Sequence, residues 1–351
     1  MISVFGPLLV ALLSGLVLAS AALWALAIQK VASGAAIVRL EPRRAVPWGL
    51  LDVVVIFGFV TLLLIGAQTA VAEWANFPPG VGLKDLSAHQ LAQAIFANSV
   101  AMLLGCAAAV AVLVARTGAG IDDLGASLRR MLDDLRLGFL AFLMIAPPMY
   151  VLQWGLTQVW PSEHPVQTLL MEDRQASMLA VTLFTAVIAA PLSEEFLFRV
   201  ILQGWLEKVS LFFSPSAGGS DLAGPPDESP SATNDGPAHS PPGKPDTLGN
   251  PYATPQADLF FTGALSPTDD GAAADVAART AHWPMFASAL VFALLHAGHG
   301  PDPIPLFFLA VGLGFLYQRT HRMLPCIVVH FLVNSTSMVA LLVSLLAQPA
   351  A

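Results

Sequence analysis

Six long apolar runs constrain the fold of this chain more than any other feature of its sequence. Each run approaches or exceeds the ~20 residues that a helix needs to cross a lipid bilayer. They lie at about residues 6–28, 48–72, 91–115, 137–160, 178–206 and 324–347. Two shorter runs, at about 283–297 and 303–318, are consistent with either short membrane helices or a re-entrant pair. The pattern predicts an all-α, polytopic membrane helical bundle with about eight transmembrane helices, and at least six.

The composition excludes a water-soluble globular enzyme. Apolar residues make up 56% of the chain and charged residues only 11%, whereas soluble domains average about 45–50% and about 25%. Most of the net charge of -8 lies between Phe212 and His282, where nine acidic residues accompany two basic ones. The nearly neutral remainder offers no basic surface for nucleic acid, so we expect no nucleic-acid partner.

Residues 212–281 differ in composition from the rest of the chain. This segment is rich in Pro, Gly, Ser and Asp and holds 11 of the 27 prolines. It has no sustained apolar periodicity, so it cannot bury enough apolar surface to offset the entropy of ordering. We expect a long disordered insert, which divides the chain into four parts: helices 1 to 4 at 1–177, one helix at 178–211, the insert at 212–281 and the last helices at 282–347.

The distribution of Lys and Arg predicts the orientation in the membrane. If eight helices cross, the odd-numbered loops carry 13 Lys and Arg residues and the even-numbered loops only Lys84 and Arg174. Positive residues stay on the cytoplasmic side, so we expect the odd loops and the insert in the cytoplasm and both termini outside. Five tryptophans near the ends of the runs are expected either at the membrane interface or as core residues: Trp48, Trp74, Trp160, Trp205 and Trp283.

Six polar or ionisable side chains lie where hydropathy predicts membrane. A charge inside a bilayer costs at least ~2.5–3.5 kcal/mol on insertion scales, so such residues indicate a functional site. They are Glu194, Glu195, Arg199, His296, His330 and Asn334.

The spacing of the first three residues separates their expected roles. Glu195 and Arg199 are four apart and can pair on one helical face. Glu194 is turned by about 100° from its neighbour and lacks that partner, and an unpaired carboxylate in apolar surroundings can act as a base. The alternative is a plain helix start, in which Ser193 caps a helix that begins after Pro191 and the two acids favour its first turn.

The two histidines and the asparagine complete the predicted cluster. His330 and Asn334 are four apart and point to one side of the last helix. His296 ends the stretch Phe292–His296 of a short helix. A lone buried histidine is usually a satisfied core residue, but two histidines, a free glutamate and an asparagine in apolar helices together favour a site.

Three motifs in this order resemble those of the CPBP family, the CAAX proteases and bacteriocin-processing enzymes, or type II CAAX prenyl endopeptidases. They are Glu194-Glu195-x-x-x-Arg199, Phe292-x-x-x-His296 and His330-x-x-x-Asn334. The run Gly312–Thr320 before Pro325 is also similar, and the resemblance covers about 178–340. The chain departs from the family where about 85 residues separate Phe198 from His282, and the insert accounts for this length.

The resemblance implies an intramembrane endopeptidase in the bilayer, with a membrane-bound peptide or a lipidated protein as substrate. Glu194 would activate the attacking water, and His296 and His330 would orient that water or bind the scissile carbonyl. Asn334 would donate a hydrogen bond to the oxyanion, and Glu195 with Arg199 would hold the helices together. The expected location is the plasma membrane of a bacterium.

Two chemistries and two other functions stay open at this point. Glu194, His296 and His330 would be the ligands if a zinc ion is present, because two histidines and a glutamate suit a catalytic zinc site. The compact His-Glu-x-x-His motif is absent, and we favour a metal-free mechanism with Glu194 as the base. The functional alternatives are a non-catalytic member of the fold, as a scaffold or in bacteriocin immunity, and an ion- or proton-coupled transporter.

Overall fold

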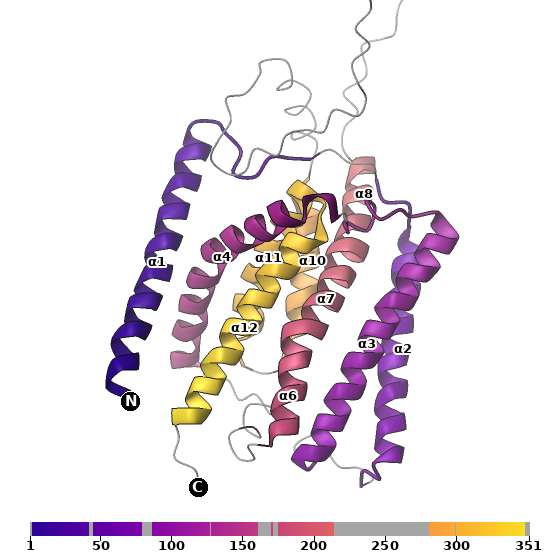
Figure 1. Ribbon diagram of the computed structural model, residues 1–351. Coiled ribbons are helices and arrows are strands. Elements are labelled where there is room, and N and C mark those ends of the chain that lie inside the picture. Colours follow the sequence, from indigo (N-terminus) through magenta and orange to yellow (C-terminus); the bar gives the residue numbers. More distant parts are fainter. Residues whose placement is uncertain are drawn as a thin grey trace, which may run out of the picture.

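The computed structural model describes residues 2–41, 45–78, 86–126, 128–160, 170, 175–213, 281–298 and 300–347. Within these ranges every regular element is a helix (Figure 1). The elements are α1 (Ile2–Ala32), α2 (Leu50–Trp74), α3 (Ala88–Thr117), η2 (Leu128–Arg130), α4 (Met131–Val159), α6 (Ala176–Phe184), η3 (Thr185–Ala189), α7 (Ala190–Glu194), η4 (Glu195–Gln203), α8 (Gly204–Phe213), α10 (Trp283–Leu294), α11 (Pro303–Thr320) and α12 (Met323–Ala347).

The predicted all-α membrane bundle is confirmed. The described residues contain six helices that are long and apolar enough to cross a membrane. The two shorter apolar runs also form helices, α10 and α11. At 1.5 Å per residue the 12 residues of α10 extend about 18 Å, less than the ~30 Å hydrocarbon core of a bilayer. The predicted insert lies outside the described residues, except for its ends at 212–213 and 281.

The core of the bundle lies where α2, α10, α11 and α12 pack against the π-helical segment η4, and α4 packs against α11 and α12. Buried side chains such as Phe198, Phe292 and Leu313 belong to one apolar cluster. The helix pairs α4–α12, α10–α11 and α2–α3 are in contact, and Figure 1 shows α2 and α3 side by side. Many large apolar side chains on the outer faces are exposed, as expected where helices face lipid rather than water.

Glycines set the closest helix contacts of this core. A Cβ atom on Gly138 of α4 would lie 2.6 Å from Cβ of Val328 and 2.9 Å from the carbonyl oxygen of Pro325, both on α12. A Cβ atom on Gly312 of α11 would lie 2.7 Å from Cδ1 of Ile145 on α4. Small residues at such positions allow membrane helices to approach closely.

Charged side chains from several loops meet at one end of the bundle. Arg116 at the end of α3 pairs with Asp52 at the start of α2. Glu41 accepts from Arg130 at 3.0 Å and from Arg322 at 2.9 Å, which joins the loop after α1 to η2 and to the α11–α12 turn. The first residue of α1 and the last of α12 lie at the opposite end (Figure 1). The loops predicted to be cytoplasmic therefore contribute charged contacts at a single end.

Trp48 is a core residue, which is the second of the two alternatives that the sequence left open for the tryptophans. It is fully buried, and its Nε1 donates to the carbonyl oxygen of Ile201 in η4 at 3.2 Å. Trp74, Trp160 and Trp283 are exposed, and Trp205 is half-buried. The hydropathy pattern showed only that an apolar run begins at Trp48. It did not show that the loop before α2 folds back onto η4.

Candidate active site

One continuous helix, built from α6, η3, α7, η4 and α8, carries the first motif. It contains two π-helical segments, and the first begins six residues before Pro191. The alternative in which Ser193 caps a new helix is wrong, because Ser193 Oγ donates to the carbonyl oxygen of Ala189 within the same helix at 2.7 Å. A proline inside a helix lacks the N–H that the regular pattern requires, which explains the local widening at this point.

Side chains from other helices donate to backbone carbonyls of the π segments. Asn334 Nδ2 donates to Ala186 at 2.7 Å, and Ser288 Oγ donates to Phe198 at 2.8 Å. With Trp48 on Ile201, each bond ties a neighbouring element to the motif helix. Such bonds matter in a bilayer, because no water is present to satisfy backbone groups.

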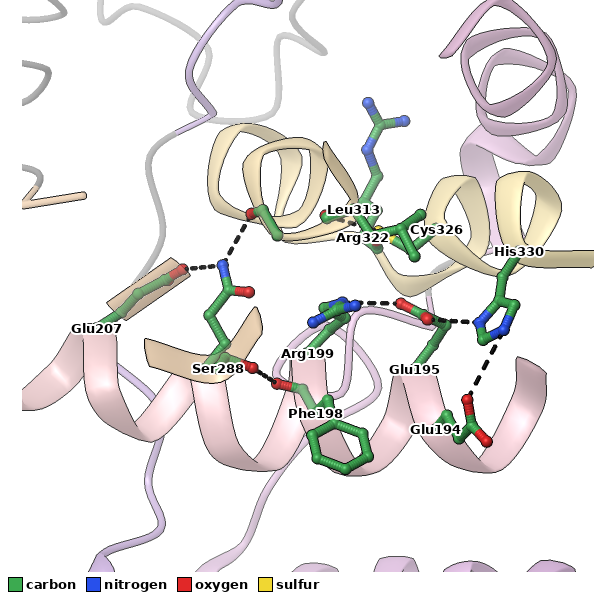
Figure 2. A network of polar contacts seen from close by, with 12 residues as sticks. Glu194, Glu195, Phe198, Arg199, Glu207, Ser288, Leu313, Arg322, Cys326 and His330 are labelled. Carbon is green, nitrogen blue, oxygen red and sulfur yellow. Dashed lines mark hydrogen bonds and ion pairs between the residues drawn. The ribbon is translucent and has the colours of Figure 1, made fainter. Parts of the chain in front are cut away.

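Glu195 lies at the centre of a buried chain of polar contacts (Figure 2). Its Oε2 accepts from Arg199 Nε at 3.0 Å, and both side chains are fully buried, so the predicted pair forms. Its Oε1 accepts from His330 Nδ1 at 2.8 Å. The second contact was not predicted from the sequence, which assigned Glu195 to Arg199 alone. Both oxygens of Glu195 are therefore engaged.

Glu194 lies on the other side of the same imidazole (Figure 2). Its Oε2 is 3.7 Å from His330 Nε2, and the Glu194 side chain keeps 19% of its surface exposed. Because a carboxylate can only accept, Glu195 places a proton of His330 on Nδ1. In the neutral imidazole Nε2 is then an acceptor towards Glu194. The Glu195 carboxylate thus orients the His330 imidazole that lies beside the Glu194 carboxylate.

His296 lies just beyond the end of α10, in a turn and not in the helix. Its Nδ1 donates to the carbonyl oxygen of Phe292 at 2.8 Å, because a carbonyl can only accept. The ring of Phe292 lies 4.7 Å from the His296 ring and 6.2 Å from the His330 ring, and the Arg199 guanidinium lies over it at 5.5 Å. The only indication in the sequence that Phe292 packs against the site was its position four residues before His296.

Asn334 lies one turn beyond His330 on α12, as its spacing predicted. Its amide nitrogen donates to the Ala186 carbonyl on the motif helix. One of its two amide hydrogens is therefore used within the protein. The structure thus brings Arg199, His296 and His330 around Phe292 and places Glu194 and Glu195 at the His330 ring. Asn334 lies one turn further along, on Ala186.

Gln203 extends the buried polar chain beyond what the sequence indicated. Its Nε2 donates to Glu207 Oε1 at 2.9 Å and to the Gly314 carbonyl at 2.8 Å. Its Oε1 is buried without a hydrogen-bond partner among the described residues, and so are Nη1 and Nη2 of Arg199. Figure 2 shows polar groups following the motif helix from Glu194 to Glu207. Hydropathy did not single out Gln203, because one amide scarcely changes the mean of an apolar run.

The donor atoms of Glu194, His296 and His330 suit zinc in type, but the described side chains do not converge on one position. Among the residues that the structure describes, no three His, Cys, Asp or Glu side chains form a group that could hold a metal ion. We therefore assign no step of the chemistry to a metal.

The fold and this buried cluster of carboxylate and imidazole groups define a multi-pass membrane protein with a polar site inside its bundle. Residues 258–336 match the family model described as type II CAAX prenyl endopeptidase Rce1-like. The matched stretch contains His296, His330 and Asn334, and the first motif precedes it. No curated protein and no solved structure matches the chain. The match supports the resemblance read from the motifs, and the chain is similar to CAAX protease-type membrane proteins.

Proposed function

We propose that this protein is an intramembrane endopeptidase in which Glu194 activates the water that attacks a peptide bond. One observation carries the proposal: Glu194 Oε2 and His330 Nε2 face each other at 3.7 Å, while Glu195 has both oxygens engaged. Glu194 is the partly exposed carboxylate of the two, so it is the one that a water and a substrate can reach.

Two acceptors beside one another suit a water molecule. A water that donates one hydrogen to Glu194 and the other to His330 Nε2 directs its lone pairs away from both, towards a substrate carbonyl. Glu194 takes a proton as the water oxygen bonds to the carbonyl carbon, whose oxygen becomes an oxyanion. The proton then passes to the amide nitrogen as the C–N bond breaks, which leaves a carboxylic acid and an amine.

The remaining side chains position this centre. Glu195 and Arg199 fix His330 from behind, and His296 is proposed to help orient the water from the α10 side. The oxyanion role that the family resemblance implies for Asn334 would require its second amide hydrogen, because the first is on Ala186.

The proposed substrate is a membrane-bound peptide or a lipidated protein, cleaved within the bilayer. The match to a prenyl endopeptidase family supports a substrate that reaches the site from the membrane. We further propose that the charged end of the bundle faces the cytoplasm of a bacterium and that the protein resides in the plasma membrane.

The first prediction tests Glu194. Glu194→Gln keeps the shape of the side chain and removes the base, so we expect cleavage of membrane-bound prenylated and unprenylated peptides to be abolished. Purified protein in liposomes provides the assay, and an unchanged thermal midpoint shows that the variant is folded. The matched control is Glu73→Gln: this residue is exposed near the end of α2, and the variant should cleave as the parent does. Full activity in Glu194→Gln would overturn the mechanism.

The second prediction concerns metal. We propose a metal-free reaction, in which case activity survives chelator treatment and the active protein holds no stoichiometric zinc. Elemental analysis of chelator-washed, active protein measures this directly. If the protein holds one zinc ion per chain, and if activity is lost when the zinc is removed and returns when it is added back, the metal-free mechanism is wrong.

A further inference from the structure

We propose that Asn334 is a positioning residue: its amide replaces a backbone donor that Pro191 removes, and so fixes the helical turn that presents Glu194. The inference rests on the proposed function in taking Glu194 as the catalytic base. It assigns Asn334 a task different from that of an oxyanion donor.

The backbone around Ala186 explains why a side-chain donor is needed there. In an α-helix the carbonyl of Ala186 would accept from the N–H of Ala190. Here the Ala190 N–H donates to Thr185, five residues back, in the π pattern. In that pattern the donor for Ala186 would be residue 191, which is a proline and has no N–H.

Asn334 supplies the missing donor from another helix. Its Nδ2 lies 2.7 Å from the Ala186 carbonyl oxygen, a short bond in good range. A carbonyl left without a donor inside a bilayer is unfavourable, so the bond stabilises the π pattern at η3. In the same π segment, the hydroxyl oxygen of Thr185 lies 2.7 Å from Ser99 Oγ of α3.

With this bond, two residues of α12 make polar contacts with the motif helix. Asn334 holds Ala186, and His330, one turn earlier, contacts Glu194 and Glu195. Together the contacts fix both the rotation and the height of α7 relative to the imidazole. Loss of the Asn334 bond leaves His330 in place but frees the turn before Glu194, so the carboxylate and Nε2 lose their alignment. A displacement of about 1 Å can lower a rate ~100-fold.

A substitution at Pro191 can distinguish the positioning role of Asn334 from a role as an oxyanion donor. If Asn334 acts through the Ala186 carbonyl, giving residue 191 an N–H should make it dispensable. If Asn334 donates to the oxyanion, its loss should cost the same whatever residue occupies position 191. A double-mutant cycle measures this dependence.

The experiment compares four proteins in liposomes: the parent, Asn334→Ala, Pro191→Ala and the double variant. We expect Asn334→Ala alone to lower kcat on the order of 100-fold with little change in KM. In the Pro191→Ala background the same change should lower kcat by less than about threefold. The matched control is Ser288→Ala, which removes a donor to Phe198 in η4, and its effect should not depend on residue 191.

The thermal unfolding midpoint provides a second readout that needs no substrate. Asn334→Ala should lower the midpoint in the parent and leave it nearly unchanged in the Pro191→Ala background. Equal losses in both backgrounds, in rate and in midpoint, would overturn the positioning role. If the parent cleaves no peptide, the proposed function is wrong. The midpoint change caused by Asn334→Ala, compared between the parent and the Pro191→Ala background, still shows whether Asn334 replaces the missing donor.

Discussion

At the scale of single residues, the two neighbouring glutamates differ in their partners and should differ in what their loss does. Glu195 accepts from Arg199 and from His330, whereas Glu194 lies beside the far nitrogen of His330. Glu195→Gln leaves Arg199 buried without a counter-charge, which costs about 3–5 kcal/mol of unfolding free energy. It also removes the acceptor that orients His330. We therefore expect a lower thermal midpoint together with a lower cleavage rate.

Glu194→Gln is the control for this comparison, because it should abolish cleavage without lowering the midpoint. A Glu195→Gln protein with an unchanged midpoint and no activity would show that the roles of the two carboxylates are reversed. Thermal unfolding and cleavage measured on the same preparations separate these outcomes.

The sequence predicted local contacts of the site better than distant ones. The Glu195–Arg199 pair followed from a spacing of four, because such residues share a helical face. The Glu195–His330 bond joins positions 135 residues apart, and no periodicity reports which helices pack together. The buried location of Trp48 was ambiguous for the same reason, since its partner Ile201 lies 153 residues away.

At the scale of elements, the long helices were predictable and the π segments were not. The length of an apolar run reports a membrane helix, and all six long runs became helices. In a π segment the backbone hydrogen bonds join residues five apart and not four apart. This change leaves the pattern of apolar residues intact, so hydropathy does not reveal it. Pro191 was the one local signal, and it had instead suggested a helix start, which the continuous helix contradicts.

Two glycines of α4 provide a test of helix packing. Gly138→Ala would place a Cβ atom 2.6 Å from Val328 and 2.9 Å from the carbonyl of Pro325, and α12 would have to move. We expect a destabilisation of about 1–3 kcal/mol, and lower activity because α12 carries His330. Gly155→Ala on the same helix meets nothing within 4 Å and should be neutral or slightly stabilising. Thermal unfolding in detergent compares them, and equal midpoints would contradict the close α4–α12 contact.

At the scale of the whole molecule, several segments that are distant in sequence meet at the charged end of the bundle. Contacts among Glu41, Arg130 and Arg322 join three segments distant in sequence, and Lys208 of α8 donates to the Trp48 carbonyl at 2.8 Å. The count of Lys and Arg anticipated that these loops share a side, because charge bias is a property of whole loops. It did not predict the individual pairs, which depend on tertiary packing.

The predicted insert joins two helices that already lie together, which leads to the last prediction. α8 ends at Phe213, α10 begins at Trp283, and these helices are in contact. We therefore propose that a short polar linker can replace about residues 216–278, since the entropy of closing a loop changes only slowly with its length. We expect the shortened protein to keep its thermal midpoint and to cleave peptides within about threefold of the parent rate.

A second variant separates the length of the insert from its sequence, because a Gly/Ser segment of the original length keeps the spacing and removes every side chain of the insert. If the short linker preserves the midpoint and the rate, the Gly/Ser variant must do so as well. Loss of folding in both variants would mean that side chains of the insert pack against the bundle. Loss of cleavage in both variants with unchanged midpoints would mean that the insert helps to bring the substrate to Glu194, which would contradict an independent catalytic bundle.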